Sequence, residues 1–265
     1  YKGKALEKEI APFEASIANL KKNLTEGKLS NGMKYGLINK AIKGDKVMAN
    51  FKLLAGNEKD LAGKNSIGAL TAQLLNAGTK TKTKEQIQDR LDQLKSSINS
   101  RISGQNLYIS VNTYKNSYQE VMEILKDMLT NSTFPQNEIT NKITEQNTYL
   151  EAQLKDPKAI AQNELPRMTA PYPKESVFYT ASLQEQIDNN KKITRDQIVN
   201  YYENILGANN GVGTVLGNVD SKIAAASLES TFGKFNSKSK YTEIKPTYYE
   251  TKKADKIFLT PDKEN

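Results

Sequence analysis

Neither cysteine nor histidine occurs anywhere in the 265 residues of this chain. Without cysteine the chain forms no disulfide, and without both residues it lacks the usual ligands of a structural zinc ion. The fold must therefore rest on a buried apolar core. A hydrophobic content of 37% with 8% aromatic residues is enough for such a core, in one large domain or two small ones.

The same absence limits the chemistry of the chain. Ser–His and Cys–His nucleophile systems, and ordinary zinc or copper sites, all need residues that this sequence lacks. It also contains no Gly-x-Ser-x-Gly elbow, Walker loop or Rossmann glycine pattern. The glycines of residues 211–217 resemble a dinucleotide-binding pattern only loosely, because they run through a strand instead of following one. We interpret this segment as a core strand.

The charge balance bears on the partners of the chain. Lys and Arg number 38 against 30 Asp and Glu, which gives a net charge of +8, and most of the excess is lysine spread singly along the chain. Nucleic-acid-binding surfaces cluster basic residues with aromatic ones, so we expect no nucleic-acid partner. A mild positive charge better suits an acidic companion surface. No apolar run approaches the roughly 18 to 20 residues that cross a bilayer, so we also expect no membrane span.

Apolar spacing predicts the elements of the first part of the chain. Spacings of three and four within residues 5–24 predict a helix, followed by a polar turn at Thr25–Lys28. An Asn31-Gly32 turn lies between two short β-prone runs, and residues 46–54 alternate as in a strand of the same sheet. An apolar stripe over residues 67–75 predicts the next helix.

Three capping boxes mark the starts of further helices, namely Thr83 with Gln86, Ser117 with Glu120 and Thr194 with Gln197. The other predicted elements are a hairpin over 96–114, helices over 136–170 with a break at Asp156-Pro157, an irregular loop at 170–174, a strand over 211–219, a helix over 221–232, a polar connector over 236–251 and a strand from 256. Hairpins followed by helix pairs indicate the α+β class, with a mixed or antiparallel sheet and helices packed on one face.

Several segments occur in the same order as the landmarks of a known family. They are Leu29-Ser-Asn-Gly-Met-Lys-Tyr-Gly-Leu-Ile, Leu54-Ala-Gly-Asn-Glu-Lys-Asp-Leu-Ala-Gly-Lys, Ala77-Gly-Thr-Lys with Glu85-Gln-Ile, Ala170-Pro-Tyr-Pro-Lys, Tyr202 and Val215-Leu-Gly-Asn-Val-Asp. Together they resemble the insulinase/pitrilysin family of inverted-motif zinc peptidases, in its bacterial two-half form. The resemblance covers roughly residues 25–235.

Active members of this family carry H-x-x-E-H on one helix. Two histidines at i and i+4 hold zinc, and the glutamate between them polarises the attacking water. Counting back from the Gly78-Thr79 landmark, these positions fall on Ala69, Ala72 and Gln73. Alanine has no donor atom, and the amide oxygen of a glutamine is a poor zinc ligand. The resemblance therefore implies a degenerate copy of the zinc helix.

The glutamate that the family places further downstream falls near residues 149–151 of this chain. Only Glu151 has a carboxylate there, and we interpret it as a solvated helix residue. We accordingly expect no catalytic residue, no metal ligand and no cofactor in this chain, while its substrate-binding residues are unknown.

The resemblance also implies an architecture. Two similar halves of the family's proteins, joined by a linker, close around a chamber, with zinc on one half. This chain resembles the first repeat of the second half. Residues 1–28 are then a linker helix, 29–235 an inactive repeat, and 236–265 a connector with the first strand of a truncated second repeat. The expected partners are a companion half that holds zinc and a peptide substrate. Similarity to lysine-rich two-half members suggests a bacterial periplasmic location.

Three functions remain open on the sequence. The chain is a non-catalytic fragment of a zinc metalloendopeptidase, a scaffold or docking subunit derived from the peptidase fold, or a binding module whose lysines recruit an acidic ligand. An intact H-x-x-E-H in the companion half would separate the first function from the second. Binding that collapses between low and moderate ionic strength would identify the third.

Overall fold

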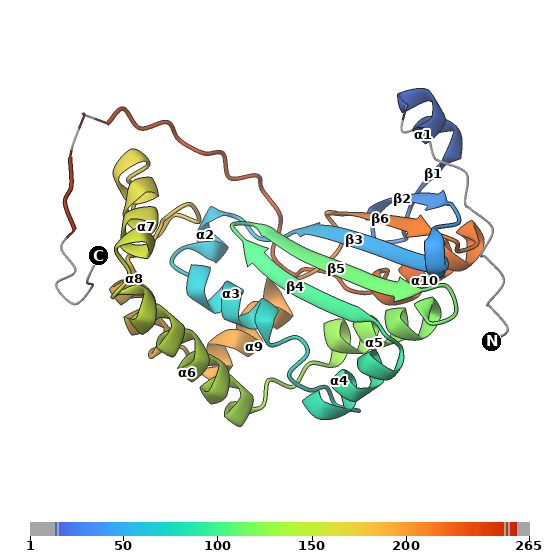
Figure 1. The fold of residues 1–265 in the computed structure, drawn as a ribbon, viewed down its shortest axis with the longest axis horizontal. Coiled ribbons are helices and arrows are strands. Elements are labelled where there is room, and N and C mark those ends of the chain that lie inside the picture. The colour runs from blue at the N-terminus through green and yellow to red at the C-terminus, as the bar shows by residue number, and fades with distance from the viewer. Residues whose placement is uncertain (1–13, 15, 252, 254, 259–265) are drawn as a thin grey trace, which may run out of the picture.

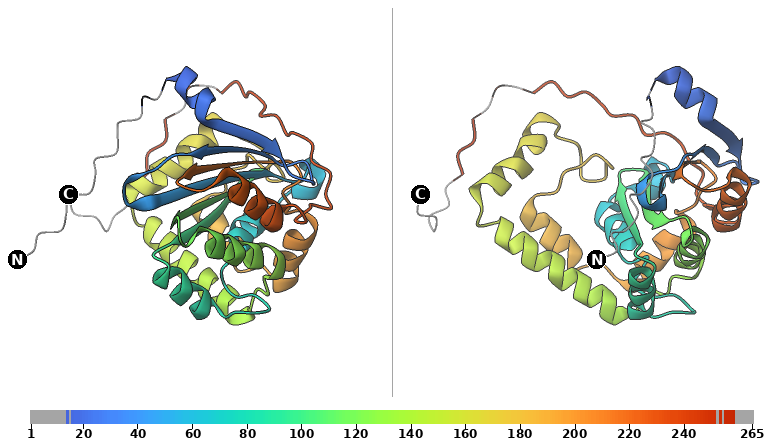
Figure 2. Two further views of the ribbon diagram at one scale, coloured as in Figure 1. Left: turned by 90° about the vertical axis from the view of Figure 1, so that its right-hand side faces the viewer. Right: turned by 45° about the vertical axis from the view of Figure 1, so that its right-hand side comes forward.

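The computed structural model describes residues 14, 16–251, 253 and 255–258 of the chain. Its centre is a six-stranded mixed sheet in the order β1-β2-β6-β3-β5-β4, with a layer of helices against one face (Figure 1, Figure 2). The strands are β1 (Leu24–Lys28), β2 (Lys34–Asn39), β3 (Lys46–Leu54), β4 (Ser97–Ser103), β5 (Asn106–Tyr114) and β6 (Gly211–Gly217). This arrangement confirms the predicted α+β class.

The helices fill most of the sequence between β3 and β4 and between β5 and β6. They are α1 (Ile17–Asn23), α2 (Glu58–Leu61), α3 (Asn65–Gln73), α4 (Lys84–Gln93), α5 (Tyr118–Asn131), α6 (Gln136–Gln153), α7 (Pro157–Thr169), α8 (Leu183–Asn190), α9 (Arg195–Asn204) and α10 (Ser221–Phe232), with a 3₁₀ turn η1 (Lys43–Asp45). Within the described part of the chain, no helix is both long and apolar enough to cross a bilayer.

The strand order differs from the chain order at two places. Strand β5, and not β4, pairs with β3, so that β4 lies at the edge. The last described strand, β6, inserts between β2 and β3, where it runs parallel to β2 and antiparallel to β3. The other neighbours are antiparallel, including the β4–β5 hairpin that the sequence predicts. The sheet is therefore complete only when a segment from late in the chain reaches its centre.

The core lies between the sheet and the helical layer. Side chains of β3 alternate between buried and exposed, as the sequence predicts, and those of β5 alternate in the same way. Phe51 of β3 meets Phe232 of α10 with 4.6 Å between ring centroids. Full burial of an aromatic side chain of this kind contributes roughly 1.5–3 kcal/mol, so this contact is a main attachment of α10 to the sheet.

Local capping explains where several helices begin. The predicted capping boxes form at Thr83 before α4 and at Thr194 before α9. The third predicted box is wrong, because the Ser117 side chain makes no capping bond and the Glu120 carboxylate pairs with Arg90, with 2.8 Å between Nη2 and Oε2. A tertiary ion pair has replaced the local contact.

The N-terminal prediction needs a correction. Residues 17–23 form α1, but residues 24–28, expected as the end of a linker helix and a turn, form strand β1. The reason is the turn at Asn31-Gly32, where Gly32 has a φ of +100° and folds β1 back onto β2. Residues 1–13 and 15 of the predicted helix lie outside the described residues.

Two other differences concern the second half of the chain. Helix α8 was not predicted, although it begins with a complete capping box formed by Ser182 and Glu185. The connector 236–251 is irregular as predicted, but residues 256–258 form no strand. The rest of that predicted strand, residues 259–260, lies outside the described part.

The loop between α7 and α8 is fixed by a charged cluster around Glu185. Its Oε2 accepts hydrogen bonds from the Tyr179 hydroxyl at 2.8 Å, from Arg167 Nη1 at 3.0 Å and from the Ser182 amide at 2.9 Å. Lys174 Nζ lies 2.7 Å from Oε1. The hydrogen bond from Lys174 and then that from the Ser182 amide hold the pKa of Glu185 far below its ordinary range, against the opposing effect of burial.

We expect Glu185→Gln to lower the free energy of unfolding by about 1–3 kcal/mol at pH 7, because Lys174 and Arg167 both lose the carboxylate that they share. Folding favours the ionised carboxylate, so its contribution is complete above the unfolded-state pKa of about 4.3 and is lost as pH falls towards the lowered native pKa. Urea unfolding of both proteins at pH 7, 5 and 3.5 measures this.

The gap between the two proteins should therefore shrink at pH 3.5. Glu145→Gln is the control, since Glu145 is 70% exposed and only pairs with Lys142 on the surface of α6. Such surface pairs contribute little to stability. A gap for Glu185→Gln that does not change with pH would contradict the assignment.

Candidate functional site

Helix α3 carries the positions at which active relatives have their zinc motif, according to the resemblance above. It packs on edge strand β4, where Ser100 Oγ donates a 2.7 Å hydrogen bond to the carbonyl of Ala72. It also packs on α9, because Gly68 has no side chain and a Cβ there would lie 2.7 Å from the Tyr201 hydroxyl oxygen. These contacts fix α3 on the sheet without help from any ligand.

The three motif positions have different surroundings. Ala69 lines a cavity of about 240 Å³ that also contacts Tyr201 and Val177. Ala72 is 0% exposed, and Gln73 is exposed on the side that faces α6. Zinc needs several nitrogen, sulfur or carboxylate donors, and these positions offer a single amide oxygen. The residues present do not fit a zinc ion, and the described residues include no group of three or more Asp or Glu placed to hold a metal.

Amide side chains occupy the place next to the degenerate motif. Gln146 Nε2 of α6 donates to Gln73 Oε1 at 2.9 Å, and Asn190 Nδ2 of α8 donates to Asn147 Oδ1 at 3.0 Å and to Gln146 Oε1 at 3.3 Å. We call these four residues the amide cluster. It joins α3, α6 and α8 through neutral groups. Because amides neither gain nor lose a proton near neutral pH, the cluster offers no general acid or base.

The structure also locates the side chain that faces Gln73 from the neighbouring helix. That side chain is Gln146, as the hydrogen bond shows. Glu151, the carboxylate considered from the sequence, is exposed on α6, and Tyr149 is 64% exposed. A ligand on α6 that reached the side chain at position 73 would therefore come from position 146.

Sequence reasoning missed the three other members of the amide cluster, although one signal was present. Ile139, Ile143, Asn147 and Leu150 recur at spacings of four and three on α6, and only Asn147 in this stripe is polar. Asn147 is 8% exposed and Asn190 is 6% exposed. A buried polar residue within an apolar stripe predicts a hydrogen-bond partner from another element.

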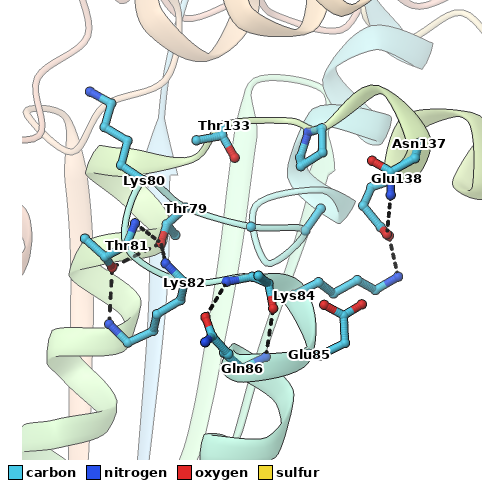
Figure 3. A pocket seen from close by; sticks show the side chains of 14 residues that line it. Thr79, Lys80, Thr81, Lys82, Lys84, Glu85, Gln86, Thr133, Asn137 and Glu138 are labelled. Carbon is cyan, nitrogen blue, oxygen red and sulfur yellow. Dashed lines mark hydrogen bonds and ion pairs between the residues drawn. The ribbon is translucent and has the colours of Figure 1, made fainter.

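A second hollow of about 460 Å³ lies beside the loop between α3 and α4 (Figure 3). Thr79 and Thr81 each donate a 2.6 Å hydrogen bond to Asp127 Oδ2, and Lys84 Nζ lies 2.6 Å from Glu138 Oε2. Burial opposes ionisation of Asp127, but hydrogen bonds from Thr79, Thr81 and Asn131 outweigh it and lower the pKa. Asp127 thus braces the loop from outside the hollow, and Glu138, which lines the hollow, is paired with Lys84.

The geometry predicts that a zinc site can be rebuilt with a carboxylate at position 146. The variant A69H/Q73H/Q146E places two imidazoles at i and i+4 and a carboxylate against the second of them. We expect it to bind one Zn²⁺ per chain at least about 100-fold more tightly than A69H/Q73H, measured by competition with a chromophoric chelator.

The double variant A69H/Q73H is the matched control, because it keeps the natural Glu151. If Glu151 were the residue within reach, both variants would bind zinc equally well. Equal affinities would therefore show that α6 has been placed in the wrong register.

The amide cluster also has a predicted share in stability. Asn190→Ala removes both donors to α6 and leaves the buried oxygen of Asn147 without a partner, so unfolding should become easier by about 1–3 kcal/mol in urea titrations. Gln73→Ala removes one exposed hydrogen bond of the same cluster and should change stability by less than about 0.5 kcal/mol. Equal losses in the two variants would contradict the assigned burial.

Comparison with known proteins identifies the family of this chain. Residues 46–180 match the family described as Insulinase (Peptidase family M16), and residues 192–265 match the Peptidase M16 inactive domain. No curated protein sequence gave a significant match.

Several solved structures share the fold at low identity. A peptidase M16 inactive domain from Pseudomonas fluorescens is 16% identical with a TM-score of 0.72, and the match covers 87% of this chain and 55% of that one. The periplasmic protease PqqL from Escherichia coli is 20% identical with a TM-score of 0.70, covering 87% of this chain and 26% of that one. The separate first half of PqqL is also 20% identical with a TM-score of 0.70, covering 86% and 50%.

The chain thus spans about half the length of the shorter matched proteins and about a quarter of complete PqqL. At these identities the structural likeness establishes the fold. The family match covers just over half of this sequence, and the chain belongs to the insulinase family of peptidases, family M16.

Proposed function

We propose that this chain is a non-catalytic part of a zinc-dependent metalloendopeptidase, in which it forms one wall of a peptide-binding chamber while a companion half supplies the zinc. The observation that carries this proposal is that α3 is well packed but has no metal-ligating side chains at the motif positions. The helix keeps its packing on β4 and α9, but Ala69, Ala72 and Gln73 stand where ligands would be needed. A peptidase fold that is intact without its metal ligands supports a role in shape and contact instead of chemistry.

The length of this chain relative to the matched proteins supports a larger parent protein. The chain covers half of the first half of PqqL and about a quarter of the complete protein. We therefore propose that this chain is one repeat of a two-half protein. PqqL is a periplasmic protease, and this similarity also supports our proposal of a periplasmic location.

The sheet face opposite the helical layer provides a suitable contact surface. Strand register places basic residues in one row across this face, and we call it the basic row: Lys28, Lys34, Lys52 and Arg101. Arg101 stacks over the Tyr108 ring at 4.3 Å from its centroid. A hollow of about 410 Å³ lies beside them, lined partly by Asn50 and Asn99.

Apolar side chains form a second row on the same face, four residues along each strand from the basic row: Leu24, Ile38, Met48 and Leu216. Met48 is 38% exposed, and Val212, which pairs with Lys34 and Lys52 within the basic row, is 46% exposed. One row of residues separates the apolar row from the basic row. An apolar strip on the same face as a line of positive charge suits a protein surface that is apolar with an acidic border. We propose that the companion half presents such a surface.

A scaffold or docking role is the second candidate, favoured by the match of residues 192–265 to an inactive domain. Under this function the companion half would be degenerate as well. The two candidates therefore differ in the companion half and not in this chain, whose α3 looks the same in either case.

The parent protein provides the test. We expect the complete parent to bind one zinc ion through an intact H-x-x-E-H outside this chain, and to cleave peptides in a chelator-sensitive way. Replacing the glutamate of that motif by glutamine should abolish cleavage, whereas Gln73→Ala in this chain should leave kcat within about twofold. Metal analysis and peptide assays measure both.

Two outcomes would change the conclusion. A folded parent without peptidase activity in the presence of zinc would favour the scaffold function. Stoichiometric zinc in this chain alone, with cleavage that a chelator stops, would overturn both candidates.

A further inference from the structure

The connector follows α10 without forming a helix or strand, yet side chains of the domain hold it along most of its length. We infer that the end of the domain around Gly56 and Gln105 is a binding groove for an extended peptide backbone, which the connector of this chain occupies, and that Gln105 is its clamp. This groove is separate from α3 and from the open sheet face. The inference concerns this chain itself and does not depend on the proposed function.

Gln105 stands at the tip of the β4–β5 hairpin and uses both ends of its amide. Its Nε2 donates to the carbonyl of Thr242 at 2.8 Å and to that of Gly56 at 3.2 Å, while its Oε1 accepts from the Ile244 amide at 2.8 Å. The Thr242 amide donates to the Gly56 carbonyl at 3.2 Å. One side chain thus imitates the edge of a strand, as in backbone recognition by strand addition.

Further anchors lie before the clamp. Asn57 Nδ2 donates to the Lys240 carbonyl at 3.1 Å, and the Ser239 amide donates to the Asn204 carbonyl at 2.9 Å. The Ser239 hydroxyl donates a short hydrogen bond to Asp60, and this bond is the main cause of the lowered pKa of Asp60. These contacts are made mainly to the connector backbone.

Anchors after the clamp come from the loop that follows α7. The Tyr172 hydroxyl donates to the Thr247 carbonyl at 2.9 Å, and the Tyr172 ring meets Tyr249 edge to face with 4.9 Å between centroids. Ile244 is half-buried and packs on the core between the two sets of anchors. The connector is therefore attached at both ends of the clamp.

The groove explains why the connector, although exposed, has one defined conformation along the domain. Lys238, Lys240 and Lys245 are exposed, so the connector has little apolar area to bury. Exposed segments of this kind open locally at low cost unless their backbone groups are bonded. Because the bonds go to the backbone, we expect the groove to tolerate most side chains of the connector and to depend on the amide of Gln105. The clamp then sets the direction in which the chain leaves the domain.

The test removes the clamp from the chain of 265 residues. In Gln105→Ala, hydrogen exchange of the Ile244 amide should become roughly tenfold faster, and trypsin should cut after Lys240 roughly tenfold faster, because several bonds of the connector are lost together. The melting temperature and the protection of β3 and β5 amides should change little. Gln105→Glu keeps the acceptor for Ile244 but loses the donor to Thr242, so its effect should be intermediate.

Gln88→Ala is the matched control, since Gln88 is an exposed glutamine on α4 that bonds only Asp92, at 3.0 Å. It should leave both readouts unchanged. Should Gln105→Ala also loosen the hairpin, Ile244→Pro removes the donor from the connector side and leaves the hairpin intact. Unchanged cleavage after Lys240 in Ile244→Pro, or unchanged exchange and cleavage in a folded Gln105→Ala, overturns the inference.

Discussion

The insertion of β6 between β2 and β3 is the constraint on which the rest of the structure depends. It joins the N-terminal strands to the end of the domain and carries α10 to its place against Phe51. The inserted strand must leave room for the large side chains of the neighbouring strand. Gly213 leaves this room, because a Cβ there would lie 2.7 Å from the Phe51 ring. Since β6 is separated from β5 by five helices, the centre of the sheet forms through long-range contacts. Such contacts make folding slower than in a protein of similar stability whose contacts are local.

Features that depend on neighbouring residues could be predicted from the sequence, and features that depend on distant ones could not. The alternation of β3 and the caps at Thr83 and Thr194 are local, and they were predicted. The place of β6 in the sheet has no local signal. At Ser117 a distant arginine removed Glu120 from its predicted capping role, and at residues 24–28 pairing with β2 replaced the predicted helix end and polar turn by a strand. The motif positions expected from the family resemblance were counted along the sequence and stay a prediction, whereas the amide cluster was found only once the helices were placed.

Neutral hydrogen bonds join the helices around α3. In the amide cluster, bonds of about 0.5–1.5 kcal/mol each connect α3, α6 and α8. The bonds also satisfy the buried oxygen of Asn147, which would be costly if left alone. The stability of this cluster therefore depends on carboxamide hydrogen bonds within the chain. This agrees with the contact role that we propose, because such a surface does not depend on a metal ion for its shape.

The same kind of side chain holds the irregular segments at the end of the domain where α3 begins. Asn65 Nδ2 donates to the carbonyls of Ser176 and Val177, as Gln105 does to the connector, so that loops without regular pairing still have bonded backbones. Backbone groups away from helices and strands need such partners when water cannot reach them. In a chain that has neither cysteine nor histidine, disulfides and zinc cannot fix such loops. Carboxamides do part of this work here, together with the charged cluster around Glu185 in the loop between α7 and α8 and the Tyr172 contacts to the connector.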